Sequence, residues 1–252
     1  MFDAVLWGLI QGLTEFLPIS SSGHLVLVPA VLGREGPDLA TSAVLHLGTL
    51  VAVLIYFRAE VSHILRLTTQ GKRLLRLLAI GTIPAAVLGF TFKSGVESLN
   101  ENPTGVAIAL LLTGVALFAT RWIPRGRRTM SDSTDVDAGT LGLGQALALI
   151  PGVSRSGATI ATGLLRGFER AEAARFSFLL GIPAIAGAGL LEFIELAGDG
   201  GGISNATWVG MAVAAVSGYA AIALLLRLIG RAGLTPFGIY CVGFGAVALF
   251  LV

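Results

Sequence analysis

Residues 11–24 read QGLTEFLPISSSGH and interrupt the apolar stretch 4–34 with a proline and a run of serines. A second stretch, PGVSRSGAT at 151–159, interrupts the apolar region 141–168 in the same way. Each interruption leaves two segments that are too short to cross a bilayer, which takes about 20 apolar residues. Broken pairs of this kind predict re-entrant helix–loop–helix elements. A single proline-kinked span is the alternative for each region.

The composition around these two stretches is that of a membrane protein. Hydrophobic residues make up 54% of the 252 residues and charged residues only 13%, with a mean hydropathy of +0.84. A soluble protein has about 25% charged residues, so a water-soluble globule is excluded. The 34 glycines favour closely packed transmembrane helices. The single cysteine, Cys241, excludes an intrachain disulfide and a cysteine metal cluster.

The remaining apolar stretches predict an all-α integral membrane protein with six transmembrane helices in addition to the two re-entrant elements. The six predicted spans are 41–57, 74–92, 104–123, 174–196, 206–229 and 235–252. Three spans follow each broken region, so the second set enters the membrane from the opposite side. The N-terminal region has no basic start, which argues against a signal peptide there.

The two broken regions also match each other in sequence. A shift of 134 residues places Gln11 on Gln145, Ser20 on Ser154 and Ser22 on Ser156. Together with the odd number of spans per half, this predicts an inverted repeat whose broken helices meet near the bilayer midplane. We therefore expect one membrane domain over the whole chain. Its predicted parts are repeat one at 1–123, a linker at 124–140 and repeat two at 141–252.

The distribution of lysine and arginine predicts the orientation. With six spans, 14 of the 17 basic residues fall on one side, which should be cytoplasmic. Both termini then face outward, and the mouth of the first broken element opens to the outer face. The charges of the 124–140 linker are interpreted as a solvated hinge without chemistry.

The first loop combines a helix end with two polar side chains on one helix face. Pro18 should end the first half-helix near Leu17, because a proline disfavours helical geometry in the residue before it. Gln11 and Glu15 are four residues apart and share a face of that half-helix.

The serines of the first loop can begin the next half-helix. Ser22 is the predicted N-cap, which leaves Gly23 and His24 in the first turn. Free backbone N–H groups at such a terminus bind anions, phosphate above all. Ser20 and Ser21 add hydroxyl groups, and His24 adds a group that titrates near neutral pH.

The second loop places an arginine among serines. Ser156, or alternatively Ser154, is the predicted N-cap of the following half-helix, and Arg155 lies at the tip. A guanidinium at membrane depth requires an anion, and its planar fork suits two phosphate oxygens. The alternative is that Arg155 extends to the membrane surface.

Ionisable residues inside apolar segments are functional candidates, because burying them is costly. Glu15 and His24 occur only in the first loop, and Arg155 occurs only in the second. The alternative is that Glu15 pairs with His24 or Arg155 only to hold helices together. The two loops together predict a site for a phosphate or diphosphate on a lipid. Transport of a lipid phosphate or a small anion is the competing function for this architecture.

The two stretches resemble the signature motifs of the undecaprenyl-diphosphate phosphatase (bacitracin-resistance protein) family. The resemblance covers nearly the whole chain and includes HLGTLVAV at 46–53, FSFLLGIPA at 176–184 and PFGIY at 236–240. It implies a membrane hydrolase that converts undecaprenyl diphosphate to undecaprenyl phosphate, recycles this carrier for peptidoglycan synthesis and confers bacitracin resistance. It also implies the cytoplasmic (inner) membrane of a bacterium and a divalent cation, Mg²⁺ or Ca²⁺.

The resemblance assigns roles to individual positions. The catalytic residues that it implies are Glu15, Ser21, His24 and Arg155. The implied diphosphate-binding residues are Ser20, Ser22, Gly23, Ser154, Ser156, Gly157 and Thr159. The implied metal ligands are Glu15 and Gln11, where Gln11 is neutral at a position at which other members carry a carboxylate.

The sequence does not decide whether Ser21, His24 or an activated water is the nucleophile. If Ser21 or water attacks, His24 is the expected general base. His46 is interpreted as a hydrogen-bonded residue within a span. The expected partners are a polyprenyl diphosphate and the lipid bilayer. No nucleic acid is expected, and a homodimer is compatible with the prediction.

Overall fold

The computed structural model describes residues 1–198 and 204–252, and its regular secondary structure over these residues is helical. The first half contains α1 (Phe2–Phe16), α2 (Ser21–Leu32), α3 (Leu39–Tyr56), α4 (Arg58–Leu65), α5 (Thr69–Thr91), α6 (Lys93–Asn100) and α7 (Pro103–Ala119). Two 3₁₀ turns, Thr120–Trp122 and Met130–Asp132, precede the second half. The second half contains α8 (Asp135–Leu147), α9 (Arg155–Leu165), α10 (Arg170–Gly198), α11 (Asn205–Ala232) and α12 (Thr235–Leu251).

The helices confirm an all-α, multi-pass membrane protein. Within the described residues, four helices are long and apolar enough to cross a bilayer, namely α5, α7 with its 3₁₀ turn, α10 and α11. The pair α3 and α4, bent by 85°, counts as a fifth span when taken together. α12 is apolar but has only 17 residues, so the predicted total of six spans remains a prediction. The side chains of Lys93 and of residues 191–196, which belong to the predicted topology, lie outside the described part.

Both predicted interruptions of the helices are present. α1 ends at Phe16, and Leu17 is extended with a ψ of 141° because Pro18 follows it. The predicted N-cap of the first loop was wrong, and so was the preferred of the two predicted N-caps of the second loop. Ser20, not Ser22, caps α2, and Ser154, not Ser156, caps α9. The backbone turns earlier than the serine pattern alone indicates.

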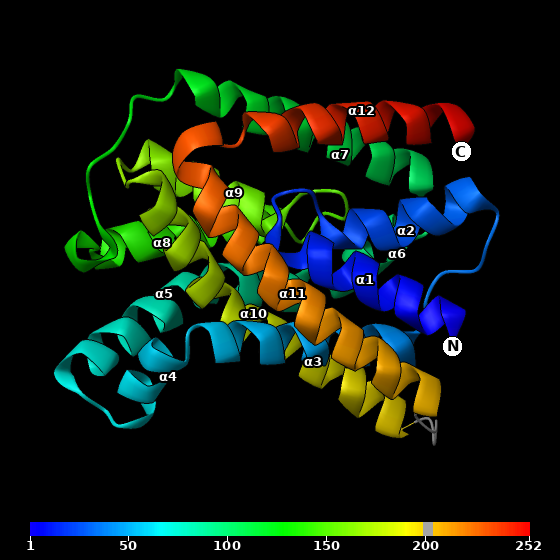
Figure 1. Cartoon of the computed structure of the whole chain (residues 1–252), viewed down its shortest axis with the longest axis horizontal. Helices are drawn as coiled ribbons and strands as arrows, with labels where there is room; N and C mark the ends of the chain where they lie inside the picture. Colours follow the sequence, from blue (N-terminus) through cyan, green and yellow to red (C-terminus); the bar gives the residue numbers. More distant parts are fainter. Residues whose placement is uncertain (199–203) are drawn as a thin grey trace.

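The packing joins helices from the two halves. α1 contacts α11, α5 contacts α8, α3 contacts α10, and α7 lies beside α12 (Figure 1). Glycines permit the closest of these approaches, as predicted from the composition. A Cβ atom on Gly114 of α7 would lie 2.8 Å from the carbonyl oxygen of Gly238 in α12, and the reverse distance is the same. The core between the halves contains Phe16 and Phe178, which meet edge to face at 5.6 Å.

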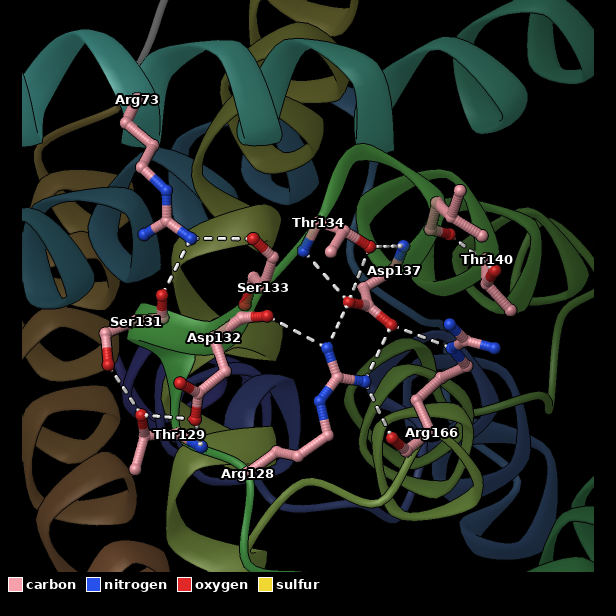
Figure 2. A network of polar contacts seen from close by, with 11 residues as sticks. Arg73, Arg128, Thr129, Ser131, Asp132, Ser133, Thr134, Asp137, Thr140 and Arg166 are labelled. Carbon is pink, nitrogen blue, oxygen red and sulfur yellow. Dashed lines mark hydrogen bonds and ion pairs between the residues drawn. The ribbon is translucent and has the colours of Figure 1, made fainter.

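The segment predicted as a solvated hinge is instead partly buried. α8 already begins at Asp135, and the carboxylate of Asp137 is 0% exposed. Figure 2 shows the guanidinium groups of Arg128 and Arg166 approaching this carboxylate from two directions, at 2.5 and 2.8 Å. Thr134 donates both its backbone N–H and its hydroxyl to the same oxygen, Oδ2. The interpretation of this segment as solvated was therefore wrong for Asp137, whose buried carboxylate pairs with both arginines.

Both chain ends lie at one end of the molecule, and α4 and the 123–134 segment lie at the opposite end (Figure 1). The broken helices α1, α2, α8 and α9 lie between these ends. Their interruptions therefore meet in the interior, where the candidate site is built.

Candidate active site

Glu15 is the centre of the candidate site. Its Oε1 accepts a hydrogen bond from Nη2 of Arg155 at 3.0 Å. Its Oε2 accepts from the hydroxyl of Ser21 at 2.6 Å and from Nε2 of Gln11 at 3.1 Å. The carboxylate is 7% exposed, so these donors replace the water that a buried charge loses. Residues from both loops thus meet at one carboxylate.

The two loops also contact each other directly. The hydroxyl of Ser20 lies 3.4 Å from the carbonyl oxygen of Val153, and the hydroxyl of Ser156 donates to the carbonyl of Leu17 at 3.2 Å. These contacts join residues far apart in the chain. The predicted meeting of the two interruptions is confirmed.

The two helix starts are built alike. The Ser20 hydroxyl accepts from the N–H of Gly23 at 3.2 Å, and the Ser154 hydroxyl accepts from the N–H of Gly157 at 3.1 Å. Ser20 has a φ of 68°, a left-handed conformation that is strained for serine. The positive ends of the α2 and α9 dipoles therefore lie on either side of the polar loops, where they favour a negative charge.

A cavity of about 210 Å³ opens between the loops. Polar side chains from both halves contribute to its wall: Thr14, Glu15, Ser20, Ser21, Ser22, His46, Gln145, Ser154 and Arg155. Arg155 is 14% exposed at its side chain and is the cationic group of this wall, so the cavity can hold a small anion.

The other predicted site residues lie behind the cavity wall. Gln11 is fully buried and contacts Glu15, and Ser156 is 1% exposed. Gly23 and Gly157 are buried in the first turns of their helices. Thr159 is 0% exposed and bonds to the hydroxyl of Ser177 and to backbone carbonyls of α9. These groups support the cavity without lining it.

His24 does not line the cavity with Glu15 and Ser21. Its Nδ1 donates to the carbonyl of Ser20 at 2.8 Å, so Nε2 accepts the hydroxyl proton of Tyr240 at 2.8 Å when the ring is neutral. The ring stacks on Tyr240 and Phe244 of α12. The structure therefore places His24 where it holds the turn before α2 against α12.

Four polar residues of the site, Thr14, His46, Gln145 and Ser177, were not singled out for chemistry from the sequence. His46 and Gln145 line the cavity, and the carbonyl of Ser177 lies 3.4 Å from Nη1 of Arg155. His46 donates from Nδ1 to the carbonyl of Ser42 at 3.0 Å. The match of Gln145 to Gln11 under the repeat shift was the signal that could have identified it.

The donors around Glu15 limit how a divalent cation fits. The described residues contain no group of three or more His, Cys, Asp or Glu side chains placed to hold a metal ion. Gln11 donates from its amide nitrogen to Glu15, and its amide oxygen is buried without a hydrogen-bond partner. Both amide atoms of Gln145 are buried without a hydrogen-bond partner. A cation therefore fits here only as a site of one carboxylate, one amide oxygen and substrate phosphates, which suits Mg²⁺.

The fold and the site together define an integral membrane protein with a buried, polar anion site between two broken helix pairs. Comparison with known proteins makes this more specific. Residues 4–247 match the family model of the bacitracin resistance protein BacA. The chain belongs to this family.

Named relatives match along nearly their whole length. The chain is 42% identical to an undecaprenyl-diphosphatase of Desulforudis audaxviator, over 99% of this chain and 97% of the relative. It is 42% identical to an undecaprenyl-diphosphatase of Geobacter sulfurreducens, over 100% and 98%. It is 40% identical to undecaprenyl-diphosphatase 3 of Frankia alni, over 99% and 94%.

Proposed function

We propose that this protein is a membrane hydrolase that removes the terminal phosphate of undecaprenyl diphosphate, so recycling the lipid carrier for peptidoglycan synthesis and conferring bacitracin resistance. Family membership and the full-length relatives support this function. The observation that carries it is the junction at Glu15, where a serine hydroxyl and an arginine from two separate loops meet. This combination provides a nucleophile and a cationic clamp for a phosphoryl group.

Binding of the diphosphate begins with Arg155. In the resting protein its guanidinium pairs with Glu15 at 3.0 Å. The anionic diphosphate competes with Glu15 for the guanidinium of Arg155. It also binds to the N–H groups at the starts of α2 and α9. Ser20, Ser22 and Ser154 add hydroxyl donors from the cavity wall. Charge developing on the transferred phosphoryl group is stabilised by these fixed donors.

The hydroxyl of Ser21 attacks the terminal phosphorus. Its proton passes to Glu15, which already accepts it in a hydrogen bond of 2.6 Å. The new Ser–O–P bond forms as the bond to the bridging oxygen breaks, and undecaprenyl phosphate leaves. Glu15 gives its proton to the departing phosphate. Water then attacks the phosphoserine and passes a proton to Glu15, which protonates the Ser21 oxygen as the Ser–O–P bond breaks, so that inorganic phosphate is released and Ser21 and Glu15 are restored. His24 positions the turn through the Ser20 carbonyl. Attack by water or by His24 is distinguished by trapping the phosphoenzyme.

A divalent cation, Mg²⁺ or Ca²⁺, is part of the proposal. Glu15 would hold it, together with the amide oxygen of Gln11, as predicted, or of Gln145, because both oxygens are buried without a hydrogen-bond partner. When bound, the ion neutralises charge on the phosphate oxygens. The chain's own contribution is to hold the Glu15 carboxylate aligned between Arg155 and Ser21.

The halves are proposed to form an inverted repeat with two re-entrant elements, six spans and one membrane domain. The same shift of 134 residues relates the starts of α2 and α9 and their caps, Ser20 and Ser154. We place the protein in the bacterial cytoplasmic membrane with both termini and the cavity mouth outward. The position of both chain ends opposite the basic 123–134 segment supports this orientation (Figure 1).

Release of inorganic phosphate by the purified protein tests the function. Detergent-solubilised protein is expected to release phosphate from undecaprenyl diphosphate, and Arg155→Ala is expected to abolish this release. A protein that moves the lipid across vesicles without releasing phosphate would be a transporter instead.

A further inference from the structure

An apolar groove lies next to the candidate active site. It has a volume of 790 Å³, compared with 210 Å³ for the polar cavity, and lies between α5, α6, α8 and α9. Its wall is built mainly from large apolar side chains, among them Leu88, Phe92, Leu99, Leu143, Leu147 and Ile150. The groove is therefore large and apolar enough to hold part of a hydrocarbon chain.

The two polar side chains of this groove do not need a hydrogen bond from a ligand. The hydroxyl of Thr140 donates to the carbonyl of Val136 at 2.6 Å, and that of Thr162 donates to the carbonyl of Ala158 at 2.8 Å. Both acceptors belong to the helix of the donor. An apolar occupant thus leaves neither hydroxyl unsatisfied.

Leu149 joins the groove to the polar cavity. It lines both, and it lies in the interruption between α8 and α9. Under the shift of 134 residues it is the counterpart of Glu15. On one side of Leu149 the polar cavity is lined by charged and hydroxyl groups, and on the other side the groove is lined by hydrocarbon side chains. A ligand that fits both has a phosphorylated head directly joined to an apolar chain.

We infer that this groove binds the isoprene units next to the diphosphate of the substrate, with Leu149 at the junction of head and chain. This inference rests on the proposed function. The alternative occupant, an ordinary membrane lipid, has a glycerol unit between its phosphate and its chains, whereas Leu149 lines both cavities and brings the polar one directly against the apolar one. Moving a chain from lipid into the groove gains packing contacts rather than the hydrophobic effect, so its energy contribution is modest.

The groove can be filled without disturbing the fold. Gly95 lines it, and a Cβ atom built there meets nothing within 4 Å. Gly95→Phe is expected to raise the KM for undecaprenyl diphosphate about 10-fold with kcat unchanged. The reason is that the added ring removes binding of the chain, which is equal in the ground state and the transition state, and leaves the reacting groups in place. Gly243→Phe on α12 is the matched control, since its Cβ would also meet nothing within 4 Å. It is expected to change neither value.

A second pair of variants provides a separate test if the Gly95 variant fails to fold. Leu147→Trp lies in the groove and Leu112→Trp lies on α7 outside it, at 61% and 64% exposure of the native leucines. Only Leu147→Trp is expected to raise the KM. An unchanged KM in both groove variants would overturn the inference.

Photocrosslinking separates this inference from the proposed function. The probe is an undecaprenyl diphosphate analogue with a photoreactive group on its first isoprene unit, competed with unlabelled undecaprenyl diphosphate. Competed labelling of residues 88–99 and 140–150 is expected. Labelling there without phosphate release from the substrate would retain the groove and overturn the hydrolase. Phosphate release with competed labelling only on other helices would retain the hydrolase and overturn the groove.

Discussion

The two interruptions share one construction and differ in their chemistry. In each, a serine caps a half-helix through the N–H three residues later, Ser20 to Gly23 and Ser154 to Gly157. The first loop contributes a carboxylate and the hydroxyl of Ser21. The second contributes the guanidinium of Arg155 at the position that matches Ser21.

This difference shows how two loops with the same helix caps can carry different side-chain chemistry. The shared caps give both loops a positive helix end, which binds an anion wherever it lies. The positions at which the two loops differ determine which side chains would face such an anion. Glu15 faces Arg155 in one half, whereas its counterpart Leu149 lies between the polar cavity and the apolar groove in the other. The two sides of the junction thus differ in polarity.

Removal of the second loop's unique group should have the largest effect. Arg155→Ala is expected to lower kcat/KM by about 10³-fold or more, because it removes a charged donor from the transferred phosphoryl group. Arg155→Lys should recover only part of this loss, since an ammonium lacks the planar fork. Phosphate release from undecaprenyl diphosphate measures both. Wild-type rates in the alanine variant would show that the second loop contributes only its helix start.

Removal of the nucleophile that we propose in the first loop should have the next largest effect. Ser21→Ala is expected to lower kcat by about 10²- to 10³-fold and to abolish labelling of the protein by a substrate with labelled terminal phosphate. Ser22→Ala is the control, because Ser22 lines the same cavity and its hydroxyl lies 3.3 Å from that of Ser20. We expect it to keep the label. Label on His24 in the Ser21 variant would assign the attack to the histidine.

Removal of the metal tests whether the lone carboxylate holds a cation. Chelation is expected to lower activity by about 10²-fold, and added Mg²⁺ or Ca²⁺ should restore it. Glu15→Gln should need more metal for binding in a direct calorimetric titration, a measurement that does not depend on turnover. Full activity in the presence of a chelator would show that no metal ion is needed and that Arg155 and the helix ends provide the positive charge at the site.

The far ends of the two broken pairs provide a comparison of stability. Asp3 pairs with Arg34 between α1 and α2 at 3.0 Å, and Asp137 pairs with Arg166 between α8 and α9 at 2.8 Å. The first pair is exposed, whereas Asp137 is fully buried. Asp137→Asn is expected to lower the Tm in detergent by about 10 °C, and Asp3→Asn should change it little. Equal shifts would show that burial does not distinguish the pairs.

The same pair predicts a dependence on pH. Burial alone would raise the pKa of Asp137, but hydrogen bonds from Arg128, Thr134 and Arg166 outweigh it and hold this pKa well below its usual range. The carboxylate therefore contributes stability above the ordinary aspartate pKa of about 4, and this contribution is lost as the pH falls below that value. The Tm advantage of the wild type over Asp137→Asn should shrink on acidification. A constant difference would contradict the lowered pKa.

Local patterns predicted the helix breaks and missed the caps. Pro18 ends α1 as expected, because its effect on Leu17 acts through the neighbouring residue alone. The choice between Ser20 and Ser22 was wrong because two serines two residues apart satisfy the same cap rule. The path of the chain, with Ser20 at a φ of 68°, selects between them.

The sequence by itself determined an apolar helical chain with two matched interruptions, since hydropathy, proline and serine act over a few residues. It also placed Glu15, Ser21 and Arg155 in those interruptions. The sequence also predicted that the two interruptions meet. Only the tertiary structure decided that Ser21 and Arg155 both contact Glu15, that His24 contacts Tyr240, and that Asp137 is buried. The reason is that partners more than 100 residues apart, and the burial of one carboxylate among many, depend on how whole helices pack.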